Sequence, residues 1–161
     1  LDEEIERLSA KWSAYMLAIE SMDAASGKLR EGISPKIAKN AGKLLGAMTD
    51  GKYAEIGLDT EFAMTFSDGT SMRDAAFLSA GTGDLAYICL RIALIELLYK
   101  KSLPPFIFDE SFVRMDDARM KKMLSLIAKY AELHYQSLIF TCHTREKDTM
   151  AEIASHHHLA I

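Results

Sequence analysis

The sequence predicts an α/β domain in which parallel strands alternate with helices, preceded by a long helical segment at the N-terminus. Two apolar segments of strand length, residues 105–108 and 137–141, each follow a helical segment and precede another one. This alternation is typical of parallel sheets that helices cover on both faces. The 161 residues, 49% of them hydrophobic and 26% charged, suffice for one hydrophobic core.

Composition excludes several classes of protein. The formal net charge of −4 gives no general attraction to phosphates, so any contact with DNA needs a local patch or another part of the protein. The chain begins with acidic residues, and no apolar stretch reaches the roughly 18 residues of a membrane span, so we expect a cytoplasmic protein with no membrane contact. Cys89 and Cys142 each lie in an apolar run, which predicts buried free thiols.

The N-terminal segment has apolar residues at alternating steps of three and four: Ile5, Leu8, Trp12, Tyr15, Ile19 and Met22. This is the spacing of a coiled-coil seam, and over so few heptads it also fits an amphipathic helix packed on its own domain. We expect Gly32 to end this helix. Ser34 followed by Pro35 then predicts the start of a second helix, which continues to Met48.

The middle of the chain predicts a small antiparallel sheet. Residues 53–58 and 61–66 alternate in polarity, and the turn Ser67-Asp68-Gly69 leads into a third segment toward Phe77. Helices are expected over residues 84–101, 116–133 and 145–154, and a short last strand near Leu159. The tract of residues 156–158, all histidines, fits either a solvated strand end or a metal ligand set.

The first candidate site is the carboxylate pair Asp109-Glu110, which follows the apolar strand segment directly. In open α/β sheets, ligands bind beyond the carboxyl ends of the strands. One carboxylate there can hold Mg²⁺, and its neighbour can orient or deprotonate the water that attacks a phosphate. The same pair also fits the first turn of a helix, where acidic side chains complement the helix dipole.

Two further segments have the residue types of a phosphate site. Ser79, Gly81 and Gly83 precede a long apolar helix, and small residues there let backbone N–H groups approach an anion, although an ordinary serine N-cap fits equally. His143 follows the second strand segment and lies at the same edge as the acidic pair if the strands are parallel. It can donate a hydrogen bond to a phosphate, or it can be structural.

In this order, the three elements resemble the signature motif, Walker B strand and switch histidine of ABC-type ATPases of the coiled-coil SMC/RecF/SbcC kind. Ala80 departs from the usual Ser-Gly-Gly, and Thr82 replaces the common Gln or Glu. Both departures look like the LSxGT variant of SbcC-like and YhaN-like proteins. Met115-Asp116 falls where this family has its D-loop, and residues 34–53 resemble the stretch where the chain leaves the coiled coil and re-enters the head.

The resemblance implies the C-terminal lobe of a P-loop ABC-type ATPase head, with a coiled-coil stub over residues 1–32 and the lobe over 33–161. It implies ATP and Mg²⁺ as cofactors. By similarity, Asp109 binds Mg²⁺ through water, Glu110 is the general base and His143 contacts the γ-phosphate. In a head-to-head homodimer, ATP bound to the opposite head meets four residues of the signature motif: Ser79, Gly81, Thr82 and Gly83.

The same similarity places Asp116 at the interface between the two heads. Arg91 looks like the residue that couples the signature helix to the rest of the head, although a salt bridge on the surface or to the N-terminal lobe fits equally. The sequence has no G-x-x-x-x-G-K-[ST] motif, and its one glutamine, Gln136, does not fit the Q-loop. We therefore expect one half of an ATPase head, which needs the N-terminal Walker A lobe of the same protein and does not hydrolyse ATP alone.

The implied function is ATP hydrolysis in DNA repair, recombination or chromosome maintenance, with DNA contacts through the full-length protein. One alternative is a non-catalytic module that keeps the fold for dimerisation or partner binding, although the carboxylate pair and His143 are intact. A helicase motor also has an Asp-Glu pair. The segment of residues 78–83 before that strand and Met115-Asp116 after it favour the ABC-type head.

Overall fold

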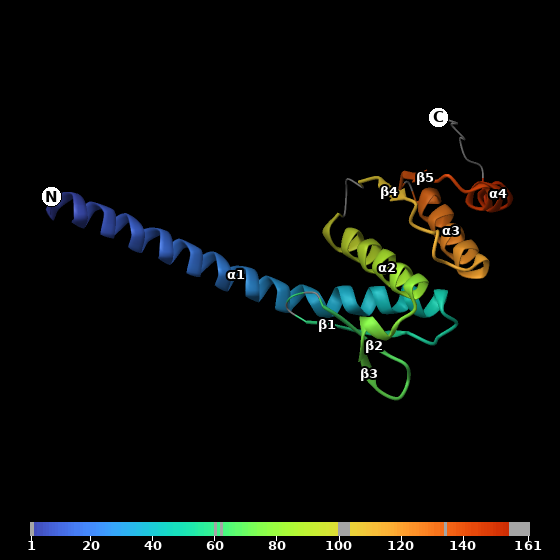
Figure 1. Cartoon of the computed structure of the whole chain (residues 1–161), viewed down its shortest axis with the longest axis horizontal. Helices are drawn as coiled ribbons and strands as arrows, with labels where there is room; N and C mark the ends of the chain where they lie inside the picture. Colours follow the sequence, from blue (N-terminus) through green and yellow to red (C-terminus); the bar gives the residue numbers. More distant parts are fainter. Residues whose placement is uncertain (1, 60, 62, 100–103, 134, 155–161) are drawn as a thin grey trace.

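A single long helix, α1 (Asp2–Met48), projects away from the other elements (Figure 1). The computed structural model describes residues 2–59, 61, 63–99, 104–133 and 135–154. After α1 the chain forms three strands and a short 3₁₀ helix, then alternates between helix and strand. These elements are β1 (Glu55–Leu58), β2 (Met64–Ser67), β3 (Met72–Asp74), η1 (Ala75–Phe77), α2 (Ala80–Leu98), β4 (Phe106–Asp109), α3 (Asp117–Glu132), β5 (Ser137–Phe140) and α4 (Thr144–Ile153).

The prediction of two separate N-terminal helices is wrong, because α1 continues through Gly32 and Pro35. A proline inside a helix removes one backbone hydrogen bond at a cost of about 3 kcal/mol. Tertiary packing offsets this cost, since the helix buries Ile37, Ala41 and Leu45 just beyond the proline, where it packs against α2 and β1. The end of the helix at Met48 agrees with the prediction.

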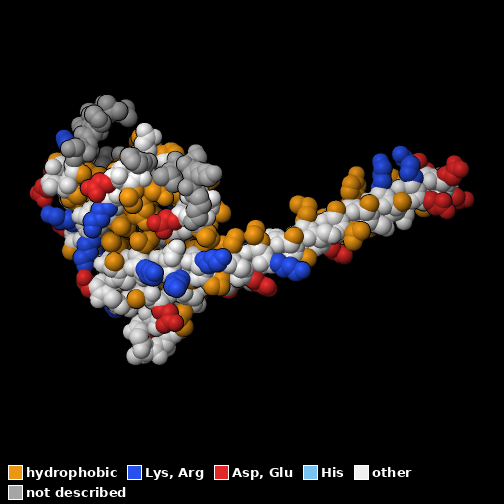
Figure 2. Space-filling view, turned by 180° about the vertical axis from the view of Figure 1, so that it is seen from behind, with side chains coloured by type: hydrophobic (Ala, Val, Ile, Leu, Met, Phe, Trp, Pro, Cys, Tyr) orange, Lys and Arg blue, Asp and Glu red, His pale blue; other side chains and the backbone are white. Residues whose placement is uncertain are grey.

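The N-terminal part of α1 exposes its apolar seam along the projecting rod (Figure 2). The exposed fractions are 58% for Ile5, 66% for Trp12 and 72% for Met22. These side chains therefore do not pack on the described part of the head, which leaves the coiled-coil interpretation as the one that fits.

The predicted antiparallel sheet is confirmed. Strand β2 lies between β1 and β3, and the register pairs Ile56 with Phe66 and Phe66 with Arg73. Ile56 and Phe66 are buried, and the sheet is joined to α1 through β1. The short strands start later than expected: β1 begins at Glu55 and β2 at Met64.

The predicted parallel pair is also confirmed: β4 and β5 are parallel neighbours, with Asp109 opposite Phe140 in the register. One face of this pair is buried through Phe106 and Phe108, which lie in the core with α3. The expectation of helices on both faces is wrong for the described chain, because Ile107 (50%) and Leu138 (48%) on the other face are about half exposed.

The three helices after the antiparallel sheet lie close to the predicted segments. Helix α2 begins at Ala80, four residues before the expected start, because the hydroxyl of Ser79 caps it. Helix α3 and helix α4 agree with the expected segments within one residue at each end. The expected strand near Leu159 and the histidine tract lie outside the described residues. Among the described helices, none combines the length and hydrophobicity that crossing a membrane requires.

Candidate nucleotide site

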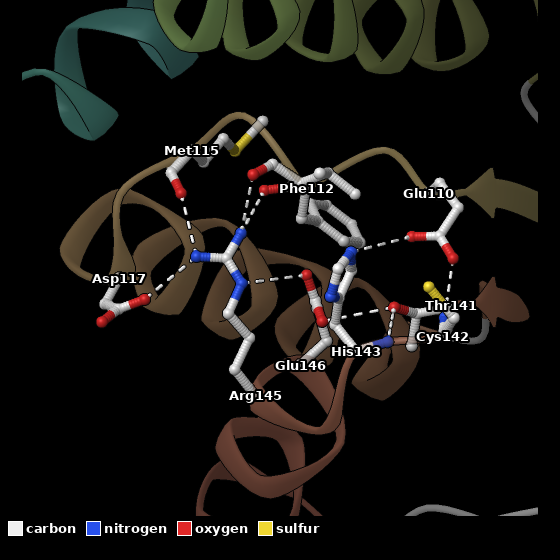
Figure 3. Close-up of polar contacts among 10 residues, drawn as sticks. Glu110, Phe112, Met115, Asp117, Thr141, Cys142, His143, Arg145 and Glu146 are labelled. Carbon is white, nitrogen blue, oxygen red and sulfur yellow. Dashed lines mark hydrogen bonds and ion pairs between the residues drawn. The ribbon is translucent and has the colours of Figure 1, made fainter.

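The structure brings Glu110 and His143 together at the carboxyl ends of the two parallel strands (Figure 3). Glu110 follows β4 and His143 follows β5, and Glu110 Oε2 lies 3.8 Å from His143 Nε2. Both side chains are partly exposed, at 39% and 44%. Asp109, the last residue of β4, is exposed on the same sheet face as Ile107. The carboxylate pair and the histidine thus share one edge of the sheet, as predicted.

Glu110 has a left-handed backbone conformation, with φ of 47°. For a residue other than glycine this conformation costs roughly 1–2 kcal/mol, and it is held here by two hydrogen bonds. Glu110 N donates to Phe140 O at 3.0 Å, and Cys142 N donates to Glu110 Oε1 at 2.6 Å. The turn therefore fixes the carboxylate across the gap between the strands, with its second oxygen directed toward the histidine.

Electrostatics keep this carboxylate ionised. The Cys142 side chain and its backbone N–H lower the pKa of Glu110, and His143 acts in the same direction. In return, Glu110 raises the pKa of the Cys142 thiol. The prediction of two buried thiols is correct for Cys89 and wrong for Cys142, which is exposed because it follows the end of β5 rather than lying within it.

The signature segment forms the N-terminus of α2. Ser79 is the N-cap: its Oγ accepts from Thr82 N at 3.4 Å and lies 2.8 Å from Thr82 Oγ1. Thr82 is buried, and Arg119 Nη1 donates to its hydroxyl at 3.0 Å. The Thr82 hydroxyl is therefore engaged within the chain, whereas Ser79 is exposed.

Gly81 lies against the loop between β4 and α3. A Cβ at this position would lie 2.2 Å from Arg114 O, so only glycine allows the helix N-terminus to approach that backbone. At Gly83 a Cβ would meet nothing within 4 Å. Arg114 also forms an ion pair with Asp84, which fastens the same loop to the N-terminal part of α2.

Asp116 ends this loop as the N-cap of α3. Its Oδ1 accepts from Arg119 N at 2.9 Å, and its other oxygen lies 3.5 Å from Arg119 Nε. Because Arg119 also donates to Thr82, the structure joins Asp116 to the signature segment through one arginine. The loop of residues 110–116 thus starts beside His143 and ends at Asp116, which Arg119 joins to Thr82 of the signature segment.

Arg145 is a residue that the sequence analysis missed. In Figure 3 its guanidinium lies at the centre of the loop: Nη2 donates to the carbonyls of Phe112 (2.8 Å) and Val113 (3.1 Å), and Nη1 donates to that of Met115 (3.1 Å). Nε pairs with Glu146, which is only 2% exposed. Its position two residues after His143 was the one available signal, but the carbonyl partners are about 30 residues away.

Glu146 links Arg145 back to the strand end. Thr141 Oγ1 donates to Glu146 Oε2 at 3.2 Å, and His143 N donates to Thr141 Oγ1 at 3.0 Å. The backbone that presents His143 and the loop that follows Glu110 therefore share one hydrogen-bonded network.

Arg91 lies outside this network. It is exposed on α2 and lies over the ring of Tyr87, with 5.9 Å from its Cζ to the ring centroid.

One protein of known sequence is similar to this chain over most of its length. The chain is 30% identical over 149 residues to the uncharacterized protein YhaN of Bacillus subtilis (strain 168), an alignment that covers 91% of the chain and 15% of YhaN. No family model matches the chain.

Two solved structures have the same fold. One is the Smc head domain with an extended coiled coil, bound to the C-terminal domain of ScpA, from Pyrococcus furiosus (TM-score 0.59, 17% identity, 89% of this chain and 37% of that one). The other comes from work on ATP-driven dimerization and DNA stimulated activation of SMC ATPases (TM-score 0.61, 15% identity, 76% of this chain and 77% of that one). The chain spans well under half the length of YhaN and of the Pyrococcus furiosus head. The chain has the fold of the C-terminal portion of an SMC-like ATPase head.

Proposed function

We propose that this chain supplies the Walker B carboxylates, the switch histidine and the signature motif for ATP hydrolysis by a two-lobed head. The single observation that carries the proposal is the position of Glu110 and His143, 3.8 Å apart at the ends of neighbouring parallel strands. A base and a hydrogen-bond donor at the same sheet edge are what the attack of water on a γ-phosphate requires.

In this proposal, Glu110 orients the attacking water and accepts its proton. The bond from Cys142 N fixes the direction of this carboxylate before ATP binds, and its lowered pKa favours the ionised form that can accept a proton. His143, which follows the neighbouring strand β5, donates a hydrogen bond to the γ-phosphate. Asp109 fits Mg²⁺, because an exposed carboxylate at a strand end offers the oxygen ligands that this ion takes. When bound, Mg²⁺ neutralises charge that develops on the phosphates.

We further propose that ATP lies between two heads of a homodimer. The N-terminus of α2 then meets the γ-phosphate of ATP bound to the opposite head, through the exposed Ser79, the backbone of Gly81 and Gly83, and the turn that Thr82 stabilises. Asp116 lies at the head-to-head contact in this arrangement. One similar structure concerns ATP-driven dimerization of SMC ATPases, which supports such a dimer.

We propose that the N-terminal Walker A lobe of the same protein covers the exposed face of the β4–β5 pair. Ile107, Leu138 and Phe140 expose about half of their surface there, and Asp109 ends the same face. A lobe that covers these side chains would bring its phosphate-binding loop beside the carboxylates. We propose that residues 33–161 form the C-terminal lobe and residues 1–32 a coiled-coil stub.

For the whole protein, we propose a cytoplasmic role in DNA repair, recombination or chromosome maintenance, with DNA contacts made through other parts of the molecule. The likeness to Smc heads supports this role. A second candidate is a non-catalytic module that uses the fold for dimerisation or partner binding. One observation favours it: the Thr82 hydroxyl and the Asp116 carboxylate already have partners within the chain.

The test is ATP hydrolysis by this chain mixed with the N-terminal lobe, compared with the same mixture carrying Glu110→Gln. We expect activity only on mixing, and a loss of about 10²-fold or more with the variant, which is the usual contribution of a general base. A mixture of two folded lobes that binds no ATP and hydrolyses none would favour the non-catalytic module.

A further inference from the structure

A second chemical feature lies at the strand ends. Glu110, Cys142 and His143 each offer one candidate ligand atom, a carboxylate oxygen, a thiol sulfur and an imidazole nitrogen, and these three atoms lie within 4.8 Å of one another. All three side chains are exposed, so a cation can reach them from solvent. In the described part of the chain, this is the one such group of three.

The backbone prepares this arrangement. Cys142 N holds Glu110 Oε1 at 2.6 Å, which places the carboxylate beside the two consecutive residues after β5. Glu110 Oε2 lies 3.8 Å from His143 Nε2. Ligands bonded to tetrahedral zinc at about 2.0–2.3 Å are separated from one another by roughly 3.5 Å. Small rotations of exposed side chains therefore suffice to close the site.

We propose that Glu110, Cys142 and His143 form a binding site for Zn²⁺. Thiolate and imidazole are ligands of zinc, whereas Mg²⁺ and Ca²⁺ take oxygen. Three protein ligands with an open side toward solvent leave the fourth position of a tetrahedral site for water. The proposed Mg²⁺ ligand, Asp109, offers only oxygen, so the two cations have different donor sets.

The consequence for activity rests on the proposed function. The carboxylate that binds zinc is the one proposed to accept the proton of the attacking water. Its Oε1 already accepts from Cys142 N, so the oxygen that faces His143 is the one open to water, and zinc bonded to that oxygen blocks it. Zinc binding and ATP hydrolysis are therefore mutually exclusive at this site, and zinc inhibits the assembled head at the concentrations at which it occupies the site.

The experiment measures zinc binding by this chain without ATP, by competition with a chromogenic zinc indicator. Every protein in the comparison, including the reference protein, carries alanine at His156, His157 and His158, because consecutive histidines can bind zinc by themselves. We expect one zinc per chain, and a loss of affinity of about tenfold or more with Cys142→Ser, since removing even a residue that only supports a ligand costs 10–100-fold. Cys89→Ser is the matched control, because this thiol is buried, and it leaves the affinity unchanged.

Substitution of Co²⁺ gives a second readout, because sulfur ligation produces a charge-transfer absorption that Cys142→Ser abolishes. Absence of zinc binding, or equal affinity in the Cys142→Ser variant, would overturn the site. Zinc binding to a reconstituted head whose hydrolysis is insensitive to zinc would overturn the inhibitory consequence. A reconstituted head with no hydrolysis at all, bound to zinc through Cys142, supports the site and counts against the proposed function only.

Discussion

Among single residues, Gly81 provides the clearest link between a motif and its packing. The glycine of the signature segment is required here by the neighbouring backbone, because a Cβ at this position would collide with the carbonyl of Arg114. The requirement therefore exists in the isolated lobe, before any nucleotide or second head is considered.

We expect Gly81→Ala to lower the free energy of unfolding by about 1–3 kcal/mol, the cost of forcing an extra methyl into a closed space. Gly83→Ala is the matched control in the same helix turn. Beyond the adjacent residues and the helix's own backbone, no atom lies within 4 Å of the position that its added methyl group would take, so the higher helix propensity of alanine should raise stability by up to about 1 kcal/mol. Urea unfolding followed by circular dichroism measures both, and equal stabilities would contradict the packing argument.

Cys142 and Glu110 are coupled through their pKa values. Glu110 raises the pKa of the Cys142 thiol, so Glu110→Gln lowers that pKa and increases the thiolate fraction at about pH 8. We expect faster alkylation of Cys142 by iodoacetamide in the variant, measured by mass spectrometry. Cys89 is an internal control, because burial raises its pKa to about 12 and it stays unmodified in both proteins. An unchanged or slower rate at Cys142 would show that the carboxylate does not act on the thiol.

The approach of Glu110 to His143 could be predicted from the sequence because parallel strands end at one edge. The long-range contacts of Arg145, Arg119 and Arg114 could not, because each arginine also meets a partner about 30 residues or more away. No periodicity or local motif encodes such a contact. The exposure of Cys142 was missed because β5 ends at Phe140, two residues before the cysteine, and the apolar pattern does not show where the strand ends.

Between elements, Arg145 at the start of α4 holds the loop that joins β4 to α3. We expect Arg145→Ala to lower the free energy of unfolding by about 2–3 kcal/mol. The loss is below the roughly 3–5 kcal/mol typical of a fully buried pair because Arg145 is one-third exposed, whereas Glu146 is buried and loses this cationic partner. Chemical denaturation measures this change.

The matched variants are Glu146→Gln alone and in combination with Arg145→Ala. Because glutamine removes the uncompensated charge, the double variant should be more stable than Arg145→Ala, and the four proteins form a double-mutant cycle. A coupling free energy near zero would mean that the two side chains do not depend on each other.

Helix α1 shows where local signals compete with packing. Gly32, Ser34 and Pro35 together are typical of a helix end and a new start, and they predicted an interruption that the structure does not have. The helix continues because its next turns bury Ile37 and Ala41 against the head. The antiparallel sheet, by contrast, follows its local turn and alternation signals, and its prediction is confirmed.

For the whole molecule, the described residues leave the seam of α1 and one face of the β4–β5 pair exposed to solvent. Helices were expected on both faces of that pair, and strand composition could not show that one face lacks a cover within the described chain. Both surfaces are compatible with the assembly that we propose, in which another lobe would complete the nucleotide site and a second head would supply the signature motif.

The most direct test of this shared site is ATP hydrolysis by a mixture of two inactive heads, each reconstituted with the N-terminal lobe. One carries Glu110→Gln and the other Ser79→Arg, which blocks the exposed N-terminus of α2. In a mixed dimer, one site combines both changes and the other has neither. For random two-fold dimers, the mixture should therefore recover about a quarter of the unmodified activity. A mixture as inactive as its two components would contradict a site shared between heads.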